Sequence, residues 1–235
     1  MEIDRARYLV SPRGREALAA AESSIRDLEP NRLATALRRS FPPAEASALA
    51  EQLTLRARAR ARFGPDFSML LTAEGLEMTT HPAVAHRRAE RLASLHLPIA
   101  DLTCGIAGDL GPVGAIVPTA IGVESDPATA MLAAANAPTA HIARGDAAKP
   151  PLRLESLAAI IDPARRGPSG RRFDPAAFSP PWDTCIDLLR TAAAGVLKAP
   201  PGLAHQHVPP WAELEAVQFG RDLRELSLWA GAGSA

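Results

Sequence analysis

Acidic and small residues follow successive apolar runs in the second half of the chain, in positions typical of a ligand site. The segment 101–109 reads Asp-Leu-Thr-Cys-Gly-Ile-Ala-Gly-Asp, and its small residues favour a tight turn that a ligand can approach closely. Glu124 and Asp146 follow the next two apolar runs. Because ligands of open α/β sheets bind at the carboxyl ends of strands, we expect these acids in one pocket. Glu124 could accept hydrogen bonds from ribose hydroxyls, and Asp146 could lie near an adenine amino group.

A fourth apolar run ends in Asp162-Pro163-Ala164-Arg165-Arg166. Asp162 could take a proton from a nucleophile, and the guanidinium plane of Arg165 could stack on a base. We therefore predict catalytic roles for Asp162 and Arg165. The alternative is structural: Asp162 caps the following turn and pairs with Arg165.

Arginines are the candidate contacts for a phosphate-bearing substrate, since the guanidinium group matches phosphate geometry. Arg87 and Arg88 come shortly before the first predicted strand, and Arg166 follows the fourth. Four more arginines alternate over residues 56–62. Residues two apart on a helix point about 200° from each other, so these four cannot form one stripe, and a solvated helix is the simpler interpretation.

The other reactive side chains indicate structure rather than catalysis. Cys104 has no base near it in the sequence, so we expect it to pack within its loop. The two cysteines and six histidines show no complete metal-ligand spacing, and no metal is predicted. Ser179-Pro180-Pro181-Trp182 is expected to pack where a loop enters a helix that runs to residue 194.

Apolar periodicity predicts an α/β fold behind these residues. Helices are expected first, and short apolar runs separated by turns then predict five parallel strands and a terminal antiparallel hairpin. The expected helices in the first part are 14–28, 33–41, 44–63 and 82–95. The expected strands are 98–101, 120–123, 140–142, 157–161, 195–197, 215–219 and 223–229. The prediction is a helical domain over residues 1–96 and a Rossmann-like domain with a seven-stranded mixed sheet over 97–235.

Composition narrows the class of protein. The chain has 235 residues and balances 26 basic against 26 acidic side chains, so any basic surface must be local. The first residues show no basic segment followed by an apolar one, and no apolar run approaches the roughly 20 residues that span a bilayer. A cytoplasmic protein without membrane contact is expected.

Residues 98–229 resemble the class I methyltransferases that depend on S-adenosylmethionine (SAM). The first motif of that family is Asp/Glu-x-Gly-x-Gly-x-Gly. This chain keeps Asp101 and Gly105, while Thr103 and Ala107 stand where the family usually has glycine. The acids after the second and third strands and the terminal hairpin also match.

A closer resemblance is to bacterial methyltransferases that carry a THUMP-like domain and are distantly related to trimethylguanosine synthase. The segments that carry it are 71–80, 81–89, 101–109, 161–166, 196–202 and 228–231. In that family the chain usually continues into the THUMP-like domain, and the tail 231–235 is consistent with a cut at a linker.

The resemblance implies a SAM-dependent methyltransferase whose substrate is an RNA, such as tRNA or rRNA. The residues that would contact SAM are Asp101, Thr103, Gly105, Glu124, Asp146 and Ala147. Two alternatives remain open: an RNA-binding or assembly module with a degenerate SAM pocket, and a nucleotide-dependent oxidoreductase.

Overall fold

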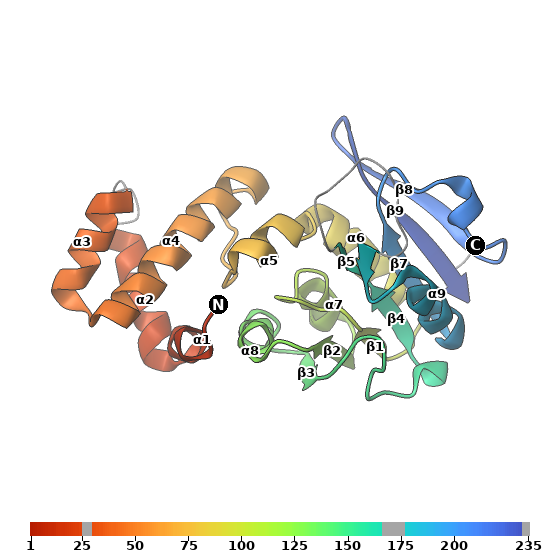
Figure 1. Cartoon of the computed structure of the whole chain (residues 1–235), viewed down its shortest axis with the longest axis horizontal. Coiled ribbons are helices and arrows are strands. Elements are labelled where there is room, and N and C mark those ends of the chain that lie inside the picture. The colour runs from red at the N-terminus through yellow and green to blue at the C-terminus, as the bar shows by residue number, and fades with distance from the viewer. Residues whose placement is uncertain (25–29, 166–176, 232–235) are drawn as a thin grey trace.

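The computed structural model describes residues 1–24, 30–165 and 177–231. Helices α1–α4 gather at one end of an elongated molecule, and the sheet with α6, α7 and α9 forms the other end (Figure 1). The helices are α1 (Ile3–Val10), α2 (Pro12–Ser24), α3 (Pro30–Ser40), α4 (Pro43–Phe63), α5 (Ala73–Met78), α6 (Pro82–Ala93), α7 (Leu110–Ile116), α8 (Pro127–Asn136) and α9 (Trp182–Thr191), with 3₁₀ turns at Leu154–Ser156 and His205–His207.

Proline and glycine set the limits of the helices that lead to the sheet. Helix α4 has Pro43 at its first turn, where the missing N–H costs no hydrogen bond, and ends at Gly64 with φ of 108°. Helix α6 begins at Pro82, and its N-cap His81 accepts a hydrogen bond from the Ala83 N–H at 3.2 Å. The breaks predicted at these prolines and at Gly64 are confirmed.

Seven strands form one mixed sheet in the order β3-β2-β1-β4-β7-β9-β8. Neighbours are parallel from β3 to β7, and β9 runs antiparallel to both β7 and β8. The strands are β1 (Ile99–Asp101), β2 (Ala120–Glu124), β3 (His141–Arg144), β4 (Ala158–Ile161), β7 (Ala194–Ala199), β8 (Glu213–Phe219) and β9 (Asp222–Gly231). The predicted α/β class, the mixed sheet and the helices before it are confirmed. A separate pair, β5 (Ala164–Arg165) with β6 (Phe178–Ser179), was not predicted.

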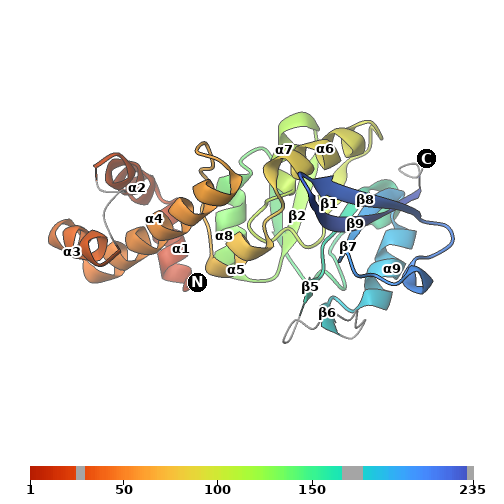
Figure 2. The same cartoon turned by 90° about the horizontal axis from the view of Figure 1, so that it is seen from above.

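Helices cover both faces of the sheet. Helices α6 and α7 share one buried cluster with β1, β4 and β7 that includes Leu92, Leu110 and Trp229. Helix α9 shares another with β4, β7 and β9 that includes Leu189 and Leu228. Figure 2 shows α6 and α7 on one side of β1 and β7 and α9 on the other. The strand ends between these layers are therefore held in fixed positions.

The N-terminal helices pack onto the sheet part through α8. Ala128 and Leu132 of α8 belong to the same buried cluster as the residues of α1, α2 and α4. The Asn136 side chain exchanges hydrogen bonds with the backbone of Leu70 at 2.8 and 2.9 Å and donates to the Ile106 carbonyl at 2.9 Å. Helix α6 lies before residue 96 yet packs within the core of the sheet.

The arginine-rich part of α4 differs from the solvated helix that the sequence suggested. Arg56 is buried, and it donates to the Met69 carbonyl at 3.0 Å and to Glu22 at 2.8 Å. Arg60 also pairs with Glu22, at 2.6 Å. The spacing of the arginines in the sequence could not predict these ion pairs, because Glu22 belongs to α2 and comes close to α4 only in the folded chain. Among the described residues, no helix has the length and apolar character to cross a bilayer.

Candidate functional site

The loop after β1 is a tight turn at the carboxyl edge of the sheet. The Thr103 N–H donates to the Asp101 carboxylate at 3.1 Å, and the Cys104 N–H donates to the Val123 carbonyl of β2 at 3.1 Å. Gly105 and Ala107 both have positive φ, 51° and 71°. The sequence pattern of small residues therefore corresponds to two left-handed backbone positions in one turn.

Gly105 leaves open space beside the loop. A Cβ built at Gly105 would meet no other atom within 4 Å. Ala107 adopts the left-handed conformation although its methyl group is buried in the core behind the loop. The space beside Gly105 is thus open, whereas the methyl group of Ala107, where the motif has glycine, points into the core.

Thr103 joins the ends of two strands. Its Oγ1 accepts a hydrogen bond from the Asp162 N–H at 2.6 Å, directly after β4. Strands β1 and β4 are neighbours at the point where the strand order reverses, which is where ligands of open α/β sheets bind. Thr103, which replaces a glycine of the motif, therefore holds the loop after β1 against the segment that follows β4.

The acids expected beside the cofactor lie along the same edge. The Glu124 carboxylate ends β2, is half-buried and accepts a hydrogen bond from the Asp126 N–H at 2.7 Å. Asp146 is exposed after β3 and accepts from the Ala148 N–H at 2.8 Å, and Ala147 between them is half-buried. The structure places these residues with Asp101 and Gly105 at one edge, and their contacts with a cofactor stay a prediction.

Asp101 lies under the loop rather than on its surface, with 3% of its area exposed. Burial, together with the negative charge of Asp109, raises the pKa of Asp101 to about 8, although the Thr103 N–H opposes the shift. The carboxyl group is therefore protonated over much of the neutral range, and it fixes the loop through its bond with Thr103.

A cleft of about 450 Å³ opens beside this edge, between the end of α4, α5, the start of α6 and the carboxyl ends of β4 and β7. Its lining includes Arg62, Phe63, Glu77, Met78, Thr79, Thr80, His81, Asp162, Pro163, Phe178, Lys198, Pro200, Pro201, Arg224 and Glu225. Asp162 lines the cleft and also contacts the loop that contains Gly105. The cleft and the expected cofactor site are therefore adjacent but distinct.

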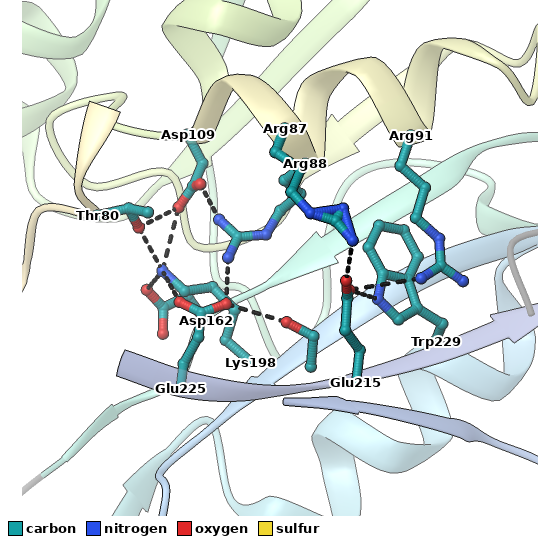
Figure 3. A network of polar contacts seen from close by, with 11 residues as sticks. Thr80, Arg87, Arg88, Arg91, Asp109, Asp162, Lys198, Glu215, Glu225 and Trp229 are labelled. Atoms are coloured by element: carbon teal, nitrogen blue, oxygen red, sulfur yellow. Dashed lines mark hydrogen bonds and ion pairs between the residues drawn. The ribbon is translucent and has the colours of Figure 1, made fainter. Parts of the chain in front are cut away.

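A network of polar contacts joins residues that line the cleft (Thr80, Asp162, Lys198 and Glu225) to the buried Arg88 and Asp109 (Figure 3). Lys198 Nζ lies 2.5 Å from Asp162 Oδ2, 2.6 Å from Thr80 Oγ1 and 3.1 Å from Asp109 Oδ2. Thr80 Oγ1 also donates to Asp109 Oδ2 at 2.7 Å. Arg88 continues the network by pairing with Asp109 and Glu225.

Three members of the network have pKa values shifted toward their charged forms. Burial alone would raise the pKa of Asp109, but Arg88 and Lys198 outweigh it and hold that pKa well below its usual value. Burial would lower the pKa values of Arg88 and Lys198, but the carboxylates around them raise both. Asp109, Arg88 and Lys198 are therefore charged at neutral pH.

The predicted substrate arginines have different environments. Arg88 has 3% of its side chain exposed and both of its ion-pair partners are internal, so its guanidinium does not reach a phosphate as the sequence had suggested. Arg87 is exposed and pairs with Glu215 at 2.6 Å. Arg165 contributes its backbone to β5, and its side chain and Arg166 lie outside the described residues.

Sequence reasoning missed Lys198 and Asp109 as members of the site. One signal was available, because Lys198 is one of two lysines in the chain and interrupts an apolar strand. A charge in a buried strand requires a partner of opposite charge. Its partners could not be assigned, because Thr80 and Asp109 are 118 and 89 residues away.

Two further predictions can be placed. Cys104 and Cys185 are buried and their thiol pKa values are raised, in the first by burial and nearby carboxylates and in the second by burial, as expected for packing residues. Trp182 is 3% exposed and packs against Phe178, so the 179–182 segment has the structural role that was predicted. Within the described part of the chain, His, Cys, Asp and Glu side chains form no group of three or more that could hold a metal.

The comparisons with known proteins agree with this architecture. A crystal structure described as a "putative methyltransferase" from Porphyromonas gingivalis W83 superposes with a TM-score of 0.70 and 21% identity, over 94% of this chain and 59% of that one. The chain has the Rossmann-like methyltransferase fold. In this methyltransferase fold the loop containing Gly105 follows the first strand, and the antiparallel β9 lies between β7 and β8.

Sequence relatives carry matching descriptions. Two proteins of Mycobacterium tuberculosis, from strains CDC 1551 / Oshkosh and ATCC 25618 / H37Rv, are each described as "Uncharacterized S-adenosylmethionine-dependent methyltransferase" and are 32% identical over 195 residues. The match covers 77% of this chain and 53% of each relative, so the chain spans about half the length of these relatives. A family described as "Domain of unknown function (DUF8688)" matches residues 2–59, which lie in the helices outside the methyltransferase fold.

Proposed function

We propose that the chain is a SAM-dependent methyltransferase that acts on RNA. The observation that supports this most directly is the Thr103–Asp162 contact of 2.6 Å, which joins the loop containing Gly105 to the cleft. A methyl donor over the loop and an acceptor in the cleft would then be neighbours, as a single displacement step requires. The descriptions of the sequence relatives point the same way.

The residues at the strand ends fit the cofactor. Because Gly105 has no side chain, the open space beside it would admit a ligand. Glu124 and Asp146 offer carboxylates beyond β2 and β3, in the positions suited to ribose hydroxyls and an adenine amino group. SAM would supply an electrophilic methyl group. The contribution of the protein is then to bind, orient and exclude water around the reacting groups.

The charge distribution of the cleft supports an RNA nucleotide as substrate. Asp162 and Glu225 lie on the inner wall, whereas Arg62 and Arg224 are exposed at its border. Aromatic side chains such as Phe63 also line it. A nucleotide has a matching group for each of these: N–H donors for the carboxylates, a flat base for the aromatic ring, and an anionic phosphate for the arginines. The resemblance to THUMP-like-domain methyltransferases adds to the argument, and the proposal places the protein in the cytoplasm with tRNA and rRNA.

Calorimetric titration of the chain with SAM, S-adenosylhomocysteine and NAD tests the cofactor. We expect binding of the first two and none of NAD; binding of NAD alone would favour an oxidoreductase. Transfer of a labelled methyl group to total tRNA and rRNA then tests the reaction, with Asp162→Asn as the matched variant. SAM binding without transfer to either RNA, in the wild type, would favour a module with a non-catalytic pocket.

A further inference from the structure

Lys198 is a buried cation whose three ammonium protons all have acceptors. Nζ donates to Asp162 Oδ2, Thr80 Oγ1 and Asp109 Oδ2 at 2.5, 2.6 and 3.1 Å, and only 7% of the side chain is exposed. Glu225 Oε2 lies a little farther away, at 3.9 Å. An ammonium group has three protons and no acceptor, so this set satisfies it completely.

The charge of Lys198 is therefore permanent at neutral pH. Burial would lower its pKa, but Asp109 and Asp162 outweigh burial and raise it. A lysine in this state can act neither as a base nor as a nucleophile, since both roles need the neutral amine. What it can do is hold the carboxylates around it.

Asp162 is held by two hydrogen bonds, one at its backbone N–H and one at its carboxylate. Its N–H donates to Thr103 Oγ1 at 2.6 Å, and its Oδ2 accepts from Lys198. The side chain is 31% exposed where it lines the cleft. Among the described groups, which do not include the side chain of Arg165, no donor forms a hydrogen bond with Oδ1. Glu225 accepts from Arg88 and from Ser227 Oγ at Oε1, and its side chain is less exposed than that of Asp162, at 12%.

We propose that Lys198 is a positioning residue that holds Asp162 Oδ2 and thereby leaves Oδ1 to accept the proton of the substrate's nucleophile. This inference rests on the proposed methyl transfer. When the nucleophile forms its bond to the methyl group and the S–CH₃ bond breaks, the nucleophile loses a proton, and Oδ1 is the atom placed to accept it. Thr80 and Asp109 take part by holding the other two protons of Lys198.

The inference can be tested by binding alone, without a known substrate. Sinefungin carries a primary amine on carbon at the position of the methylated sulfur of SAM, and S-adenosylhomocysteine lacks both the methyl group and the amine. We expect wild-type protein to bind sinefungin at least about tenfold more tightly, the size of one charge-assisted hydrogen bond. Asp162→Asn should remove this preference and leave the affinity for S-adenosylhomocysteine within about threefold.

Lys198→Gln tests the positioning role. The amide can still donate hydrogen bonds but carries no charge, so we expect the preference for sinefungin to fall to below about threefold. Lys198→Arg, which restores the charge, should recover a substantial part of it. If Lys198→Gln does not fold, Thr80→Val removes one acceptor of the ammonium group and should weaken the preference in the same direction. Thermal unfolding checks each variant.

The outcomes separate the two proposals. Failure of S-adenosylhomocysteine and SAM to bind the wild type would contradict the proposed function itself. Normal binding of S-adenosylhomocysteine, with a sinefungin preference that is absent in the wild type or is unchanged by both Lys198→Gln and Thr80→Val, would overturn only the role of Lys198.

Discussion

Two aspartates at the ends of the loop after β1 respond to burial in opposite ways. Asp109 is surrounded by Arg88 and Lys198, which stabilise its charge and lower its pKa. Asp101 accepts a hydrogen bond from the Thr103 N–H, and burial and the charge of Asp109 outweigh the opposing effects of that bond and of Lys198, so its pKa rises to about 8. Residue type alone does not distinguish the two aspartates. Their pKa values differ because Asp109 forms ion pairs with both Arg88 and Lys198.

The raised pKa of Asp101 makes stability depend on pH. An unfolded aspartate loses its proton near a pKa of about 3.9, whereas the folded one keeps it up to about 8. The folded state thus binds more protons between these values, and the stability that Asp101 contributes below about pH 4 is lost as the pH rises through about 8. Asp101→Asn removes this dependence and keeps an acceptor for Thr103. We expect it to raise the melting temperature, and to do so much more at pH 8.5 than at pH 5.

The control for this experiment is Asp66→Asn, which changes the same charge at an exposed position. Calorimetric melting from pH 5 to 9 measures all three proteins. Curves for Asp101→Asn and wild type that stay parallel over that range would show that Asp101 is not protonated in the folded state.

Gly105 provides a second test at the residue scale. Its φ of 51° makes a side chain costly, by roughly 1–2 kcal/mol, and the added methyl group would project into the space assigned to the cofactor. We expect Gly105→Ala to weaken SAM binding by at least about tenfold in titration calorimetry. Gly220→Ala is matched, since Gly220 has φ of 64° and an equally open Cβ position in the β8–β9 turn. Equal losses of affinity in both variants would remove Gly105 from the site.

At the scale of secondary structure, the sequence predicted those strands in which every residue is buried. The strands β4 and β7 are short apolar runs buried on both faces, and their predicted limits agree with the structure to within about two residues. Helix α1 was not predicted, and neither was the pair β5–β6, whose strands have two residues each and no periodicity to detect. The fold was therefore readable from local patterns, whereas the buried ionic network was not, since it joins α6, β7 and β9.

Helix α6 places two adjacent arginines in opposite environments, which allows a matched stability test. Arg88→Met would leave Asp109 and Glu225 buried without their partner and should cost about 3–5 kcal/mol of unfolding free energy. Arg87→Met removes an exposed pair with Glu215 and should cost at most about 1 kcal/mol. Urea unfolding measures both. Similar midpoints for the two variants would contradict the structural role assigned to Arg88.

At the scale of the whole molecule, the cleft is built by both parts of the chain. Arg62 and Phe63 come from the end of α4, while Asp162, Lys198 and Arg224 come from the sheet. The two parts meet where the His81 ring stacks on Phe219 at 3.8 Å between centroids. Burial lowers the pKa of His81, as do Arg224 and Arg62, so this ring is neutral and the arginines provide the positive charge at the border. The helical part thus contributes directly to the lining of the cleft.

If the cleft binds RNA as proposed, residues from both parts of the chain should have additive effects on RNA binding. Neutralising a phosphate contact lowers the slope of log affinity against log salt by about 0.7 for a single strand. We therefore expect Arg62→Ala and Arg224→Ala each to weaken binding of a single-stranded RNA oligonucleotide and to lower that slope by roughly 0.7, with about twice the change in the double variant. Fluorescence anisotropy over a salt series measures this. Arg190→Ala is the control, because Arg190 is exposed on α9 and is not among the residues that line the cleft. A slope altered by Arg224→Ala but not by Arg62→Ala would confine recognition to the sheet part and leave the helices without a role in binding.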